Sequence, residues 1–167
     1  GNDGSVAFSD ETGKAVTANG NAQIETAQKK FGTASGLFDG VDDYLSIPDN
    51  ADWYFGTGNF TIDTQVRFNT LASSSNIQSF YFQKSSWGSD YVHFYFHNTP
   101  HLLVFDVVSN GVTKAHYTAS WSPSTNNWYH IALVRSGATI YMFIDGVSQT
   151  LTINTAIGKN EIPDFTG

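Results

Sequence analysis

The chain has 167 residues, about the length of one domain, with 40% hydrophobic and 15% aromatic content. This composition is sufficient for a packed core. Only 14% of the residues are charged, which is unlike a disordered chain. The chain has no cysteine, which excludes disulfides and cysteine-ligated metals. Its net charge of −7 argues against a nucleic-acid partner. No apolar run approaches the roughly 18 residues of a membrane-spanning helix, so we expect no membrane insertion.

Most of the sequence has the pattern of β-strands. Residues 24–30 are the best helix candidate, in a chain that otherwise lacks a helical period. Residues 60–68 alternate apolar and polar side chains, as in a half-buried strand. Runs rich in β-branched and aromatic residues predict further strands at 91–96, 102–108, 112–118, 128–134, 139–144 and 147–153.

Two of these strand pairs are joined by dipeptides that favour tight hairpins. Asn110-Gly111 and Asp145-Gly146 supply the two residues of positive φ that a type I′ turn requires. At least seven strands at short spacing, with bulky residues on both faces of several, are typical of two packed sheets. The sequence therefore predicts an all-β fold, an antiparallel two-sheet β-sandwich or jelly roll.

Three segments, in order along the chain, resemble motifs of one family. Residues 31–48, which contain Phe-Asp-Gly and Asp-Tyr-Leu, resemble a stretch of laminin G-like, concanavalin A-like jelly-roll domains. Residues 60–67 resemble the next strand of that family, and the pair 128–135 and 141–146 is similar to a later hairpin. The resemblance implies a single jelly-roll domain over residues 1–167 and is greatest to the microbial and phage branch. The family's closing strand would begin at residues 165–167, so we expect a fragment of a longer polypeptide that lacks terminal strands.

Glycoside cleavage is the first activity to consider, because glucanases share this fold. Those enzymes carry two carboxylates on one strand, in the pattern Glu-x-Asp-x-x-Glu, to flank the bond that breaks. Here Glu11, Glu25 and Glu161 are the only glutamates, and none has that spacing. We therefore expect no enzyme, and the alternative requires a pair of carboxylates from distant segments. We interpret His130, inside a family motif, as a hydrogen-bonded structural histidine.

Aspartates in loops are candidates for a cation site. Asp39, Asp42 and Asp43 lie within five residues of each other in a glycine-bearing segment. Carboxylates and backbone carbonyls in tight loops are the ligands that Ca²⁺ prefers. The family resemblance also implies calcium in many members, so we predict a possible Ca²⁺ site at these three residues. The alternative is that Asp39, like Asp145, only forms a turn.

Aromatic residues beside small polar ones are candidates for sugar binding. Residues 85–91 read Ser-Ser-Trp-Gly-Ser-Asp-Tyr, and this segment is our preferred carbohydrate patch. Trp87 and Tyr91 would stack on the faces of sugar rings, and Asp90 would bind hydroxyl groups. Trp53 and Trp121 also lie beside small polar residues. For these two, the alternative to sugar binding is that they close the ends of the core.

Taken together, these patterns favour a non-catalytic glycan-binding module. It would be part of a larger cell-surface protein, adhesin or phage tail protein, and would act outside the cell or on a virion. The second interpretation is a structural or assembly (decoration) domain of a virion or surface protein. In that case open sheet edges would pair with neighbouring domains or chains of the parent protein.

Overall fold

The structure is a computed structural model that describes residues 1–71, 77–86 and 88–165. The chain forms two compact units, Gly1–Asp49 and Asn50–Gly167. The prediction of a single domain over residues 1–167 stays a prediction. Across the described ranges, no helix has the length and hydrophobicity needed to cross a bilayer.

Four short strands, paired in two ribbons, make up the regular structure of the first unit. β1 (Thr17–Asn19) pairs with β4 (Tyr44–Ser46), and β2 (Gln23–Glu25) pairs with β3 (Ser35–Leu37). Residues 24–30, the best helix candidate in the sequence, do not form a helix. Ile24 N–H donates to the Ser5 carbonyl at 2.7 Å, and the Ile24 carbonyl accepts from Gly4 N–H at 2.9 Å. Both backbone groups of Ile24 are therefore used by a neighbouring segment instead of a helical turn.

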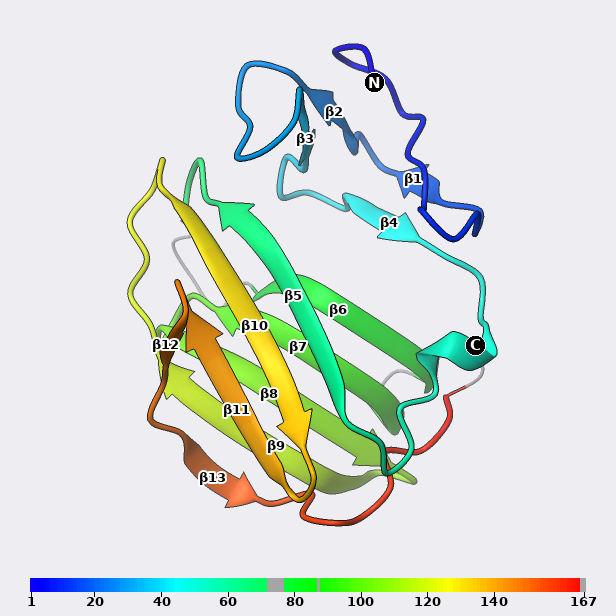
Figure 1. The fold of residues 1–167 in the computed structure, drawn as a ribbon, viewed down its shortest axis with the longest axis vertical. Helices are drawn as coiled ribbons and strands as arrows, with labels where there is room; N and C mark the ends of the chain where they lie inside the picture. Colours follow the sequence, from blue (N-terminus) through cyan, green and yellow to red (C-terminus); the bar gives the residue numbers. More distant parts are fainter. Residues whose placement is uncertain (72–76, 87, 166–167) are drawn as a thin grey trace. The chain divides into compact units, whose positions relative to one another are not determined.

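Two larger antiparallel sheets make up the second unit, after the short 3₁₀ helix η1 (Ala51–Trp53) (Figure 1). The four-stranded sheet has the order β12 (Val147–Ser148), β11 (Thr139–Ile144), β10 (Trp128–Ser136), β5 (Phe60–Arg67). The five-stranded sheet has the order β13 (Thr152–Thr155), β9 (Val112–Ser120), β8 (Leu102–Ser109), β7 (Asp90–His97), β6 (Ile77–Ser86). The predicted all-β, two-sheet antiparallel sandwich is confirmed.

The core lies between these two sheets. Every second residue of β7 and β8 is completely buried in it, as are residues of β10 and β11 from the other sheet. These side chains include Val92, Phe94, Phe96, Leu103, Phe105, Val107, Ile131, Leu133 and Met142. Because strand side chains alternate between faces, the intervening residues of β7 and β8 point away from the core. That outward face is where the polar and aromatic residues of the central strands collect.

Six of the seven predicted strands are observed within two residues of their expected ends. The predicted strand at 147–153 is wrong, because this segment contributes β12 to one sheet and the start of β13 to the other. Both predicted hairpin turns are confirmed, with φ of 52° and 69° at Asn110 and Gly111 and 50° and 77° at Asp145 and Gly146. β6 was missed. Register shifts near Phe80 and near the end of the strand break its alternation.

Candidate functional site

The outward face of the five-stranded sheet carries a row of rings along its fourth strand, β7. Tyr91, His93, Tyr95 and His97 occupy alternate positions of β7, opposite to the core residues of the same strand. Pairing with the neighbouring strands places Phe82 of β6 and Asp106 of β8 on either side of His93, and His116 of β9 beyond Asp106. We call these seven residues the tyrosine–histidine face.

His93 lies at the centre of the face and is only 4% exposed. Its ring centroid is 4.3 Å from that of Tyr95 and 4.6 Å from that of Phe82. Its Nε2 lies 2.7 Å from the Ser79 hydroxyl. Burial lowers the pKa of His93 from 6.5 to about 4, because the packed rings exclude the water that would solvate an imidazolium. His93 is therefore a neutral ring at neutral pH.

Asp106 organises the polar part of the face. Its Oδ2 accepts a hydrogen bond from the Tyr95 hydroxyl at 3.0 Å, and its Oδ1 lies 2.5 Å from Nδ1 of His116. Burial, and then the negative charge of Asp106, raise the pKa of Tyr95, so the phenol stays protonated and donates. Among the described residues, Nε2 of His116 has no hydrogen-bond partner. The Tyr95 oxygen and this ring nitrogen thus keep hydrogen-bonding capacity beyond their contacts with Asp106.

The buried neutral state of His93 predicts a pH-dependent stability. The unfolded chain binds a proton at this residue below pH 6.5, whereas the folded chain resists it until about pH 4. Folding stability should therefore fall as the pH drops from 6.5 toward 4, by up to about 3 kcal/mol from this residue. Urea unfolding at pH 7 and pH 4.5 measures the loss.

Two variants test whether His93 is responsible for that loss. His93→Gln keeps polar atoms but cannot titrate in this range, so it should lose much of the pH dependence. His97→Gln, four residues further along the same face of β7, should keep the wild-type dependence. An unchanged dependence in His93→Gln would contradict the assignment.

The predicted carbohydrate patch is only partly located. Trp87 lies outside the described residues. Asp90 begins β7, and its Oδ1 accepts the backbone N–H of Asn110 at 2.8 Å. That bond, followed by those from the side chains of Ser89 and Ser109, lowers the pKa of the Asp90 carboxyl. Asp90 thus links the loop before β7 to the β8–β9 turn, while Tyr91 is half-buried in the tyrosine–histidine face.

The three predicted calcium ligands lie in one turn of the first unit, where two of them bind backbone. The Asp43 carboxylate accepts the N–H groups of Asn21 and Asp39, and Asp39 accepts the N–H of Val41 at 2.7 Å. Asp42 adopts a positive φ of 71° in the same turn. The described residues contain no group of three His, Cys, Asp or Glu side chains that could hold a metal ion. Calcium binding here stays a prediction.

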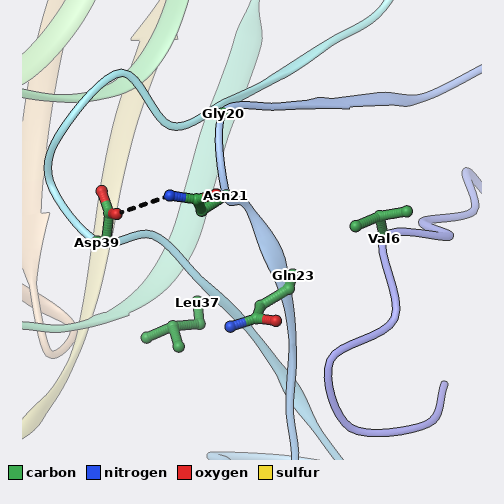
Figure 2. Close-up of a pocket in the computed structure, with 6 residues that line it drawn as sticks. All are labelled: Val6, Gly20, Asn21, Gln23, Leu37 and Asp39. Atoms are coloured by element: carbon green, nitrogen blue, oxygen red, sulfur yellow. Dashed lines mark hydrogen bonds between the residues drawn. The ribbon is translucent and has the colours of Figure 1, made fainter.

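Asp39 also borders a hollow of about 430 Å³ in the first unit (Figure 2). Its carboxylate accepts a hydrogen bond from the Asn21 amide at 3.3 Å (Figure 2). The lining residues are Val6, Gly20, Asn21, Gln23, Leu37 and Asp39. This hollow contains amide and carboxylate groups but no aromatic ring, so it lacks the stacking surface expected of a sugar site.

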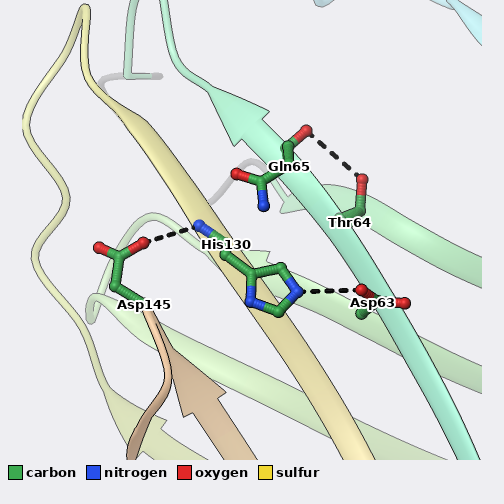
Figure 3. A network of polar contacts seen from close by, with 5 residues as sticks. All are labelled: Asp63, Thr64, Gln65, His130 and Asp145. Atoms are coloured by element: carbon green, nitrogen blue, oxygen red, sulfur yellow. Dashed lines mark hydrogen bonds and ion pairs between the residues drawn. The ribbon is translucent and has the colours of Figure 1, made fainter. Parts of the chain in front are cut away.

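A second polar network lies on the four-stranded sheet (Figure 3). His130 Nε2 is 2.9 Å from Asp63 Oδ2, and the His130 backbone N–H donates to Asp145 Oδ1 at 2.8 Å. The interpretation of His130 as a hydrogen-bonded structural histidine is confirmed. The Asp63 side chain is 58% exposed, so its contact with His130 contributes little to stability.

The strand order and the site can now be compared with known proteins. The family model for laminin G-like domains, described as the concanavalin A-like lectin/glucanases superfamily, matches residues 39–163. The chain belongs to this superfamily. The matched residues run from β4 to β13, so the concanavalin A-like region includes both large sheets and the whole tyrosine–histidine face. No curated protein and no solved structure matches the chain.

Sequence reasoning missed most of this site. Tyr91 was identified, but His93, Tyr95, Asp106 and His116 were not. The signal that points to the β7 residues is the simultaneous presence of rings at odd and even positions of 91–97, because only one set can fill the core. No comparable signal in the sequence pairs Asp106 with His116.

Proposed function

We propose that this chain is a non-catalytic carbohydrate-binding module of a larger cell-surface protein, adhesin or phage tail protein. The tyrosine–histidine face is the observation that carries the proposal. It presents half-buried tyrosine rings beside a carboxylate that is already hydrogen-bonded. Ring faces pack against the C–H faces of sugars, and fixed polar atoms orient the hydroxyl groups. Membership of a superfamily that includes lectins is consistent with this chemistry.

The acidic groups of the face favour binding over cleavage. Among the described outward-pointing residues of β6, β7, β8 and β9, Asp106 is the one carboxylate. Glycoside hydrolysis by the usual mechanism requires two carboxyl groups, one of them free to donate a proton. Both oxygens of Asp106 are instead held by Tyr95 and His116. This arrangement fits a fixed binding surface.

The proposal places the module outside the cell, at a cell surface or on a virion. A shallow single site of this kind binds sugars weakly, so display of many copies on a parent protein would raise the avidity. The partners of such a repeated, weakly binding site would be glycans on a host or cell surface.

A glycan array, followed by calorimetric titration with the best ligand, tests the function. Wild-type protein should bind, and Tyr91→Ala should bind at least about tenfold more weakly, because one stacking ring is lost. Tyr141→Ala is the matched control, since it removes an exposed tyrosine from the four-stranded sheet. Absence of binding by the wild type, or equal binding by Tyr91→Ala, would refute the proposal.

One observation favours the second candidate function, assembly through sheet edges. β5 ends the four-stranded sheet with eight residues in unbroken register with β10, and no other described strand pairs with it. The edge strand β6 has two register irregularities, which hinder strand addition. A long regular edge can accept a strand from another chain. Sizing chromatography of the protein used for the glycan array distinguishes the two functions. Assembly by strand addition would give oligomers, whereas sugar binding does not require them.

A further inference from the structure

The accessible rings of the tyrosine–histidine face form a line instead of a cluster. Tyr91, Tyr95 and His97 are half-buried and are the second, sixth and eighth residues of β7. At about 3.3 Å per residue, the backbone rises about 13 Å from Tyr91 to Tyr95 and about 20 Å from Tyr91 to His97, and the ring centroids lie somewhat closer together than that. This length exceeds the width of a single sugar ring several times.

Ring contacts make the line continuous. The centroid of Tyr91 is 6.4 Å from that of His93, the centroid of His93 is 4.3 Å from that of Tyr95, and the centroid of Tyr95 is 6.4 Å from that of His97. His93 is buried below its neighbours, so it supports the line and the two tyrosines and His97 present its surface. The accessible part is thus a strip that follows the strand.

The neighbouring strand β8 is less accessible than the strip. Its outward residues Val104, Asp106 and Val108 are 2%, 9% and 8% exposed. These values leave little surface for a ligand to contact on β8, so they favour a ligand that follows the direction of β7 in the five-stranded sheet (Figure 1).

Polar atoms near the middle of the strip select hydroxyl groups. The Tyr95 hydroxyl donates its hydrogen bond to Asp106, so the lone pairs of the Tyr95 oxygen remain available to accept one. Nδ1 of His116 is held by Asp106, so its Nε2 is a second polar atom that can form a hydrogen bond with a hydroxyl group. The strip therefore fits a ligand whose central hydroxyl groups donate hydrogen bonds to these atoms and whose two ends stack on the rings.

We propose that this strip binds an internal stretch of a linear oligosaccharide, at least three sugar residues long, laid along β7. The inference rests on the proposed carbohydrate-binding function and specifies its ligand class. A site for a single terminal sugar would use one ring and its adjacent polar atoms. The strip described here instead offers stacking positions at Tyr91 and at His97, on opposite sides of the Tyr95 hydroxyl.

A chain-length series tests this inference. The probes are the mono- to hexasaccharides of linear β-glucans, xylan, mannan and chitin, printed on one array and then titrated in solution. Affinity should rise at least about tenfold between the monosaccharide and the tetrasaccharide of the bound series, and then level off. Tyr91→Ala and His97→Ala should each weaken hexasaccharide binding, because they remove opposite ends of the strip.

Controls separate this inference from the proposed function. Tyr141→Ala should bind like the wild type, and equal melting temperatures show that each variant is folded. Sugar binding that is equally strong for the monosaccharide, or that depends on only one of Tyr91 and His97, would overturn the linear-ligand inference while the carbohydrate-binding function stands. Failure of the wild type to bind any of these probes overturns the linear-ligand inference, and failure on the broader glycan array overturns the function as well.

Discussion

Replacing Arg135 with methionine should lower the free energy of unfolding by about 3 to 5 kcal/mol, more than any surface substitution. Arg135 is 1% exposed at the end of β10. Its guanidinium donates to the carbonyls of Gly56, Gly158 and Asn160 at 2.9, 3.1 and 2.6 Å, and its Nε donates to that of Gly137 at 3.2 Å. Methionine fills similar space but donates nothing, so the carbonyls of Gly137, Gly158 and Asn160 lose this donor and that of Gly56 keeps only the Ile162 N–H.

The effect should extend beyond one hydrogen bond, because Arg135 connects distant segments. Gly56 precedes β5, while Gly158 and Asn160 follow β13. The same two segments are joined by one backbone bond, from Ile162 N–H to the Gly56 carbonyl at 2.9 Å. Without the guanidinium, the two segments keep that bond and the hydrogen bond from the Tyr54 hydroxyl to Glu161 Oε1 at 2.7 Å.

Urea unfolding of the two proteins at neutral pH measures the Arg135 effect. Arg67→Met is the matched control, because Arg67 is only half-buried and its guanidinium donates to the side chains of Asn69 and Asn126. This control should cost less than about 1 kcal/mol. A loss below 1 kcal/mol in Arg135→Met would contradict the role assigned to the buried guanidinium.

The central strands were predictable because their side chains carry two independent signals. Residues 102–108 and 128–134 are dense in β-branched and aromatic residues, and turn dipeptides end two of the hairpins. β6 was not predictable in the same way, because its register shifts move alternate side chains out of phase. Strands of three residues, such as β1 and β3, are too short for any period to show.

A β-bulge explains why the site itself was harder to predict than the fold. A plain two-residue turn at Asn110-Gly111 would continue the pairing of Ser109 with Val112 and place His116 opposite Phe105, in the core. The observed shift between Val107 and Val108 instead pairs Asp106 with His116. One extra residue thus turns His116 to the outward face.

The tyrosine–histidine face extends beyond residues 85–91, the segment in which the sequence predicted a carbohydrate patch. Asp90 is the first residue of β7, and its carboxylate holds the β8–β9 turn through the Asn110 N–H. Tyr91 belongs to a ring row that continues through His97 along the strand. Residue types in a short segment indicated sugar chemistry, but the residues that complete the face come from three further strands. Their proximity depends on strand order, which a single sequence does not state.

Replacing Trp121 with alanine should destabilise the fold by about 3 to 5 kcal/mol, the cost of removing a large buried ring. Trp121 follows β9 and is 8% exposed, which confirms the interpretation that it closes one end of the core. Its ring centroid lies 5.1 Å from that of Phe96, 5.7 Å from that of Phe68 and 5.4 Å from that of Tyr129. The neighbouring rings come from strands of both sheets and from the end of one strand. Movement of one of these side chains would therefore not fill the cavity that the indole leaves.

Thermal and urea unfolding of two variants separate cavity formation from loss of an aromatic contact. Trp121→Phe keeps a ring among the same neighbours, so it should lose less than half as much stability as Trp121→Ala. The Trp121 backbone N–H still donates to the His101 carbonyl at 2.9 Å in both variants, so the side chain alone is tested. Equal losses in the two variants would show that the indole contributes more than volume, whereas a loss below 1 kcal/mol in Trp121→Ala would contradict its role in closing the core.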